Sequence, residues 1–173
     1  MAERLYWPCW VVAAALTGVV AGFMLGHTLI LGRFLDWMLA APTPGLLAQT
    51  YPVFRGGAGR AGLDVYYGVA GLQVLAVLAF FAVALAARRQ RLAAGVAAAS
   101  GSSWLVVHYA SGFAGLEAGV LNTTAGVPGA VAARFLAWNG PIHLVHSTVL
   151  VFALVVLLCV PLMALERARE KRG

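Results

Sequence analysis

The chain has 173 residues, of which 62% are hydrophobic and only 10% are charged. Soluble domains carry about 25% charged residues, so this composition excludes a water-soluble globular domain and predicts an integral membrane protein. The formal net charge is +6, but the basic residues lie at the ends of apolar runs and not along one polar face, which excludes nucleic acid as a partner and leaves the lipid bilayer.

Four apolar segments follow one another along the chain, and each supplies the roughly 20 residues that a helix needs to cross the hydrocarbon. Because lipid offers the backbone no hydrogen-bond partners, we expect each segment to be a helix. The whole chain, 1–173, is expected to form a single transmembrane domain, an all-α integral membrane four-helix bundle. The predicted spans are about 7–32, 64–87, 92–112 and 141–165, with long outer loops at 33–63 and 113–136.

The basic residues set the expected orientation. Arg4, the cluster at 88–91 and the tail at 166–173 must share one side if there are four spans, and the positive-inside rule makes that side cytoplasmic. Both termini are therefore predicted to be cytoplasmic, in a bacterial inner membrane. The opposite loops carry weaker opposing charge from Arg33, Arg55, Arg60 and Arg134.

The histidines are the most informative feature of the sequence. His27 lies near the outer end of the first span, His108 near the outer end of the third, and His143 and His146 in the first two turns of the fourth. At 1.5 Å per residue, all four fall within roughly 10 Å of one another in depth. Ionisable groups in a membrane are costly and rarely face lipid, so we expect the four imidazoles to converge beneath the periplasmic face.

A ring of imidazoles with one or two carboxylates suits a transition metal, with copper or iron expected and zinc also compatible. Asp64 opens the second span at the same level and Glu117 follows the third, so both are predicted as further metal ligands. Two alternatives stay open for the cluster. In the first, two of the imidazoles are the axial ligands of a haem b. In the second, the cluster forms a polar cavity or a proton path without a metal.

Several of these residues also have simpler interpretations. Asp64 is suited to cap the second span, and Glu117 to be a solvated loop charge. Tyr66 and Tyr67 are predicted as catalytic donors of a proton or an electron, but both are also typical of the aromatic belt at the membrane interface.

The sequence that introduces the last span is Trp138-Asn139-Gly-Pro-Ile-His143-Leu-Val-His146. It resembles the last helix of the small four-helix membrane proteins grouped with fungal anthrone oxygenases, in which a Trp-Asn pair precedes a His-x-x-Arg-like pattern. The glycine-rich first span, the long first outer loop and segment 122–128 are also similar. Here one extra residue separates the Trp-Asn pair from His143, and His146 stands where the family more often has a basic residue. The resemblance implies oxygen-dependent oxidation of an aromatic or apolar molecule. It carries over Trp138 and Asn139 as cofactor-binding positions and His143, which is predicted as a metal ligand.

The leading hypothesis is a metal-dependent membrane oxidoreductase or oxygenase whose apolar small-molecule substrate enters from lipid. The alternative is a non-catalytic subunit of a larger membrane complex, or of a homo-oligomer, that binds haem, metal, quinone or pigment. A transporter or channel needs polar residues along a whole path, and the inner half of the chain offers only Gln73 and the serines at 100–103.

Overall fold

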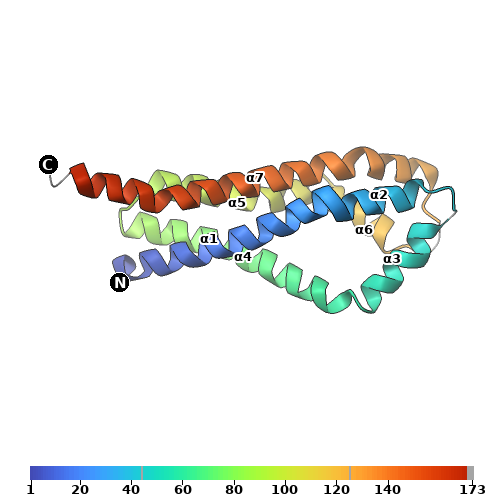
Figure 1. The fold of residues 1–173 in the computed structure, drawn as a ribbon, viewed down its shortest axis with the longest axis horizontal. Coiled ribbons are helices and arrows are strands. Elements are labelled where there is room, and N and C mark those ends of the chain that lie inside the picture. Colours follow the sequence, from blue (N-terminus) through green and yellow to red (C-terminus); the bar gives the residue numbers. More distant parts are fainter. Residues whose placement is uncertain (44, 125, 171–173) are drawn as a thin grey trace. The chain divides into compact units, whose positions relative to one another are not determined.

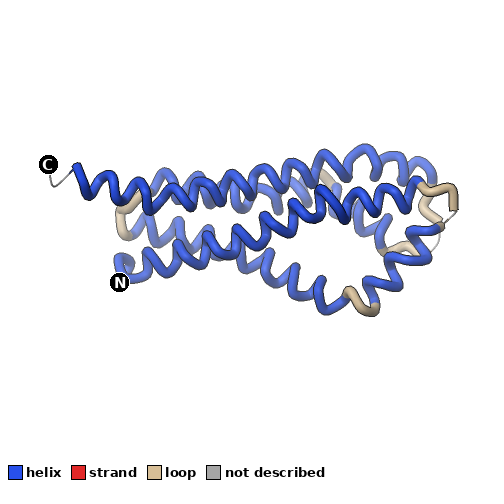
Figure 2. The backbone as a smooth tube through the Cα atoms, viewed as in Figure 1, coloured by secondary structure: helices blue, strands red, loops and turns tan. Residues whose placement is uncertain are grey.

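The computed structural model describes residues 1–43, 45–124 and 126–170. Helices make up 88% of these residues and none of them is in a strand, so the predicted all-α class is confirmed. Figure 1 shows the order of the helices, and Figure 2 shows in tan the short loops that join them. The elements are α1 (Ala2–Gly26), the π-helical turn η1 (His27–Leu31), α2 (Gly32–Ala40), α3 (Leu46–Gly56), α4 (Arg60–Ala86), α5 (Arg91–Ala110), α6 (Phe113–Leu121) and α7 (Gly129–Glu170).

The helices extend beyond the apolar segments from which they were predicted. α1, η1 and α2 form one continuous helix, Ala2–Ala40, although the first predicted span ended near residue 32. The predicted loop 33–63 contains the end of this helix and α3, and the predicted loop 113–136 contains α6 and the start of α7. Helix formation pairs the backbone N–H and C=O groups of these less apolar segments.

Among the described residues, three helices are long and apolar enough to cross a membrane: Ala2–Ala40, Arg60–Ala86 and Gly129–Glu166. Their outward faces remain apolar, with Ile30 72%, Leu75 63% and Leu162 60% exposed. A helix that is hydrophobic on all sides is suited to lipid. α5, which covers the third predicted span, is not one of the three; it begins at Arg91 and carries serines at 100, 102 and 103.

The chain divides into two compact units. The first comprises Met1–Gly22, Val69–Trp104 and the residues from Thr148 onward, and the second comprises Phe23–Gly68 and Leu105–Ser147. The core of the first unit includes Tyr6, Phe80 and Leu157, all fully buried. The core of the second includes Leu35, Phe113 and Phe135. Every residue that the sequence predicted for the site belongs to the second unit.

One buried amide stands out in the first unit. Gln73 is fully buried, and its Nε2 donates to Thr17 Oγ1 at 3.3 Å and to the Gly101 carbonyl at 3.1 Å. Its Oε1 accepts from Trp104 Nε1 at 3.2 Å. The amide, which lies on α4, thus bonds residues of α1 and α5, as a buried polar group must if its burial is not to cost stability.

Candidate metal centre

The second unit brings its four histidines together from three parts of the chain. His27 begins η1, His108 lies near the end of α5, and His143 and His146 lie one turn apart on α7. The rings of His27 and His143 are stacked, with centroids 3.9 Å apart and planes at 22°. The centroids of His108 and His146 are 5.5 Å apart, and those of His143 and His146 are 5.6 Å apart. The imidazoles therefore converge, as their common depth predicted.

A carboxylate lies among these rings. α5 ends at Ala110, and Gly112 follows with φ +76°, a left-handed conformation that suits glycine and starts α6 in a new direction. This turn brings Glu117 back beside the histidines. Its Oε1 lies 3.7 Å from His143 Nε2, and its Oε2 lies 3.7 Å from His108 Nε2. Each oxygen of one carboxylate thus faces a different imidazole.

The environment of Glu117 changes its acidity. Burial raises the pKa of this carboxyl from 4.5 to about 7, and the positive charge of Arg55 acts in the opposite direction. Burial disfavours the charged form because a carboxylate loses its water shell. A cation placed beside the carboxylate would favour its charged form, so this site is suited to exchange a proton for a metal ion.

Three of the groups meet at one point. His27, Glu117 and His143 each offer a ligand atom, and the three atoms all lie within 4.8 Å of one another. Ligands of one ion, each about 2.1 Å from it, lie about 3.4 Å apart in a tetrahedral arrangement. Closing the group around one ion would need side-chain shifts of about 1 Å together with rotation of the stacked His27 and His143 rings, because an imidazole lone pair lies in the plane of its ring. This is a group that can hold a metal.

The donor atoms are in states that suit ligation. His27 Nε2 is buried and has no hydrogen-bond partner among the residues that the structure describes. The His143 ring is oriented by the backbone of the preceding helical turn, because His143 Nδ1 lies 2.9 Å from the carbonyl oxygen of Asn139. A carbonyl only accepts, so Nδ1 carries the proton and Nε2, which faces Glu117, keeps its lone pair for a metal.

The helix turns that carry His27 and His143 are held together by polar contacts. Asn139 is 1% exposed, and its Nδ2 donates to the Gly32 carbonyl at 3.2 Å and to Asp36 Oδ1 at 2.8 Å. Thr28 Oγ1 donates to the His143 carbonyl at 3.0 Å. These bonds tie η1 and α2 to the turn of α7 that carries the site.

The π-helical turn has a local cause and a consequence. The N–H of Gly32 bonds the carbonyl of His27, five residues earlier, and the extra residue widens the turn at the histidine. A Cβ at Gly32 would lie 3.0 Å from the His27 carbonyl oxygen and 3.3 Å from its ring carbon Cδ2. Glycine is therefore favoured here, because a larger residue would press on the His27 ring and backbone.

The remaining predicted residues lie outside this group. Asp64 is exposed and lines a separate pocket together with Tyr67. Tyr66 donates its hydroxyl to Met24 Sδ at 3.6 Å, and Trp138 is 46% exposed. The structure thus brings Glu117, but not Asp64, to the imidazoles. His108 and His146 lie beside the group of three without being members of it.

Two contributions were not anticipated from the sequence. Asp36 was placed in a loop because it follows the apolar run, yet the helix continues past it and presents its carboxylate to Asn139. The spacing of Asn139 and His143, four residues apart on one helix, was the available signal for the bond between the Asn139 carbonyl and the His143 ring. Asn139, which the resemblance gives as a cofactor-binding position, bonds the Gly32 carbonyl and Asp36 through its side chain.

Comparison with known proteins adds no relative. The chain matches no family model, no curated protein and no solved structure.

Proposed function

We propose that the protein is an integral membrane, metal-dependent oxidoreductase of the oxygenase type that acts on an apolar or aromatic small molecule. The observation that carries this proposal is the meeting of two imidazoles and one carboxylate, from His27, His143 and Glu117, within 4.8 Å. Two histidines and one carboxylate are the ligand set of non-haem iron(II) oxygenases, which leave further coordination positions open. Iron is therefore the metal proposed first, ahead of copper and zinc.

The arrangement of the His27 and His143 rings also indicates whether this pair could be the two axial ligands of a haem. Axial imidazoles must lie on opposite faces of the porphyrin, whereas the His27 and His143 rings are stacked face to face at 3.9 Å. This pair is not arranged to hold a haem between its rings. The resemblance of the α7 sequence to the anthrone oxygenase group independently favours oxygen chemistry over electron transfer.

The proposed reaction is the oxidation of an activated methylene to a carbonyl. One O₂ is consumed, the methylene carbon loses two hydrogens and gains one oxygen, and one water is released, so no other reductant is needed. The metal would supply the redox chemistry with oxygen. The chain supplies the three ligand side chains, and Glu117, whose pKa burial raises to about 7 in the metal-free protein, would give up its proton as the metal binds.

The proposal includes a membrane arrangement. α1–α2, α4, α5 and α7 would be four spans with both termini cytoplasmic and the metal group near the periplasmic face of a bacterial inner membrane. For α5, Ser100 and Ser102 support this, because their hydroxyls donate to the Val96 and Ala98 carbonyls at 2.7 Å and so need no other partner in lipid. The substrate would enter from the bilayer.

Metal content tests the site directly. Protein extracted in mild detergent is analysed for iron, copper and zinc and by absorption spectroscopy, as wild type and as His143→Ala, Glu117→Gln and Asp64→Asn. We expect about one metal ion per chain in the wild type and the loss of most of it in His143→Ala and Glu117→Gln. Asp64→Asn, which changes the carboxylate outside the group, should keep the metal content of the wild type. Equal and negligible metal in all four would overturn the proposal, and a Soret band would indicate a haem-binding subunit instead.

Oxygen uptake tests the reaction. With anthrone as the probe, the wild type should consume one O₂ for each anthraquinone formed, above the background rate measured with Glu117→Gln. Rates that are equal in the two proteins would exclude this activity even if both contain metal.

A further inference from the structure

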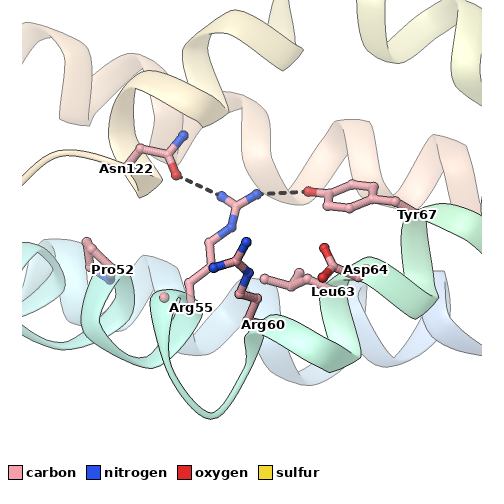
Figure 3. Close-up of a pocket in the computed structure, with 8 residues that line it drawn as sticks. Pro52, Arg55, Arg60, Leu63, Asp64, Tyr67 and Asn122 are labelled. Atoms are coloured by element: carbon pink, nitrogen blue, oxygen red, sulfur yellow. Dashed lines mark hydrogen bonds between the residues drawn. The ribbon is translucent and has the colours of Figure 1, made fainter.

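A second feature of the second unit is a pocket with a volume of about 390 Å³, separate from the metal group. Figure 3 shows its polar wall, where Arg55 from the end of α3 and Arg60 from the start of α4 point into the same space. This volume is within the range of pockets that bind small molecules. Two guanidinium groups that face one cavity repel each other unless an anion lies between them.

Arg55 is held in one orientation. Its Nη1 donates to Asn122 Oδ1 at 3.0 Å and its Nη2 donates to the Tyr67 hydroxyl at 3.0 Å, as the dashed lines in Figure 3 indicate. These two bonds use only part of the five N–H donors of a guanidinium. The group is therefore pre-oriented at the pocket with donors to spare, which lowers the entropy cost of binding a planar anion.

Arg60 provides the second charge. Its side chain is exposed at the pocket, and its guanidinium forms no hydrogen bond or ion pair with another residue in the described ranges. Asp64 lines the same pocket. Two guanidinium groups and one carboxylate leave a single net positive charge, which matches a monoanion better than a phosphate group close to −2.

The rest of the wall combines the polar Asn122 with apolar groups. Pro52, Leu63 and the ring of Tyr67 line the pocket beside the charged groups. Apolar lining with a few placed polar groups is typical of sites that recognise a small molecule with one polar end. We propose that this pocket binds the carboxylate of a monoanionic small molecule that has an apolar body. The inference does not depend on a metal at His27, Glu117 and His143.

Binding is measured by equilibrium dialysis with the protein in nanodiscs of phosphatidylcholine, with empty nanodiscs subtracted. The probe is 2-naphthoate, compared with neutral 2-naphthol, with 2-naphthyl phosphate and with inorganic phosphate. We expect 2-naphthoate to bind once per chain and at least tenfold more tightly than the other three. Equal binding of 2-naphthol would overturn the role of charge, and tighter binding of either phosphate compound would overturn the preference for a carboxylate.

Variants connect the binding to the two arginines. Arg60→Gln removes a charge from an exposed side chain without breaking a described bond, and it should weaken 2-naphthoate binding at least tenfold while leaving metal content unchanged. Arg55→Lys keeps the charge but loses the planar fork, and it should weaken binding to a similar degree. The control is Arg33→Gln, which changes an exposed arginine of α2 outside the pocket. If Arg60→Gln binds 2-naphthoate as well as Arg33→Gln does, the proposal is wrong.

Discussion

The contact between Asn139 and Asp36 allows a prediction that depends on no ligand. Asn139 is 1% exposed, and its Nδ2 bonds the Gly32 carbonyl at 3.2 Å and the Asp36 carboxylate at 2.8 Å. A hydrogen bond to a charged group contributes about 1.5–3 kcal/mol, and a neutral one about 0.5–1.5 kcal/mol. Asn139→Ala removes both, so we expect it to lower the free energy of unfolding by about 2–4.5 kcal/mol.

A double-mutant cycle isolates the bond to Asp36. Unfolding is followed by titration with sodium dodecyl sulfate in mixed micelles for the wild type, Asn139→Ala, Asp36→Ala and the double variant. Because the two side chains share one bond, the stability losses of the two single variants, added together, should exceed the stability loss of the double variant by about 1.5–3 kcal/mol. Losses that add to within about 0.5 kcal/mol would refute the bond. The matched control is Trp138→Ala beside an intact Asn139, since Trp138 is 46% exposed and should show no coupling to Asp36.

The same substitution has an expected effect on the metal group. The backbone of Asn139 accepts the proton of His143 Nδ1, and its side chain holds the turn that carries His27. Outer contacts of this kind typically change metal affinity by about 10–100-fold. Asn139→Ala keeps the backbone bond and removes the two side-chain bonds. We therefore expect it to weaken metal binding by that factor, measured by competition with a chelator, and unchanged affinity would mean that the side-chain bonds of Asn139 do not position the ligands.

Further predictions follow from three residues, Glu117, Gly32 and Gln73. Because burial raises the pKa of Glu117 to about 7, metal should bind about tenfold more weakly at pH 6 than at pH 8 through this carboxyl alone, a difference that Glu117→Gln should abolish. The stability of the metal-free protein should depend on pH in the opposite direction. A carboxyl whose pKa is raised in the folded state contributes its full stabilisation below pH 4.5, and this contribution is lost as the pH rises through about 7, which unfolding titrations at pH 4 and pH 8 would measure. Gly32→Ala should lower unfolding stability by about 1–3 kcal/mol, because its Cβ would lie 3.0 Å from the His27 carbonyl; a thermal midpoint equal to that of Gly22→Ala, where nothing lies within 4 Å of the added Cβ, would contradict this. Gln73→Leu should cost about 1–3 kcal/mol by removing the bonds of the buried amide to Thr17, to the Gly101 carbonyl and to Trp104, and an increase in stability would show that apolar packing outweighs these bonds.

The all-α fold could be read from the sequence because it depends on composition and on apolar runs. Runs of about 20 apolar residues leave helices as the cheapest structure, and helices occupy all four predicted segments. The helix ends could not be read in the same way. Arg33 and Asp36 lower the hydropathy after residue 32, yet the helix continues to Ala40 because backbone pairing persists where apolar character ends.

Part of the site could also be predicted from the sequence. The depth of a residue follows from its distance in residues to the end of a helix, since each residue adds about 1.5 Å. The common layer of His27, His108, His143 and His146 was predicted in this way. The same argument placed Asp64 and Glu117 at one level, but depth alone does not say which of two carboxylates faces inward.

Only the tertiary structure decided between them. Glu117 reaches the imidazoles because the left-handed turn at Gly112 sends α6 back beside the end of α5, whereas Asp64 lies in the pocket with Arg60. The rotation of each helix about its axis, the widened turn at His27 and the bond that leaves His143 Nε2 available depend on packing between segments distant in the chain. Such packing is not encoded in local periodicity, so the sequence by itself determined helices and a depth, and the fold determined which atoms meet.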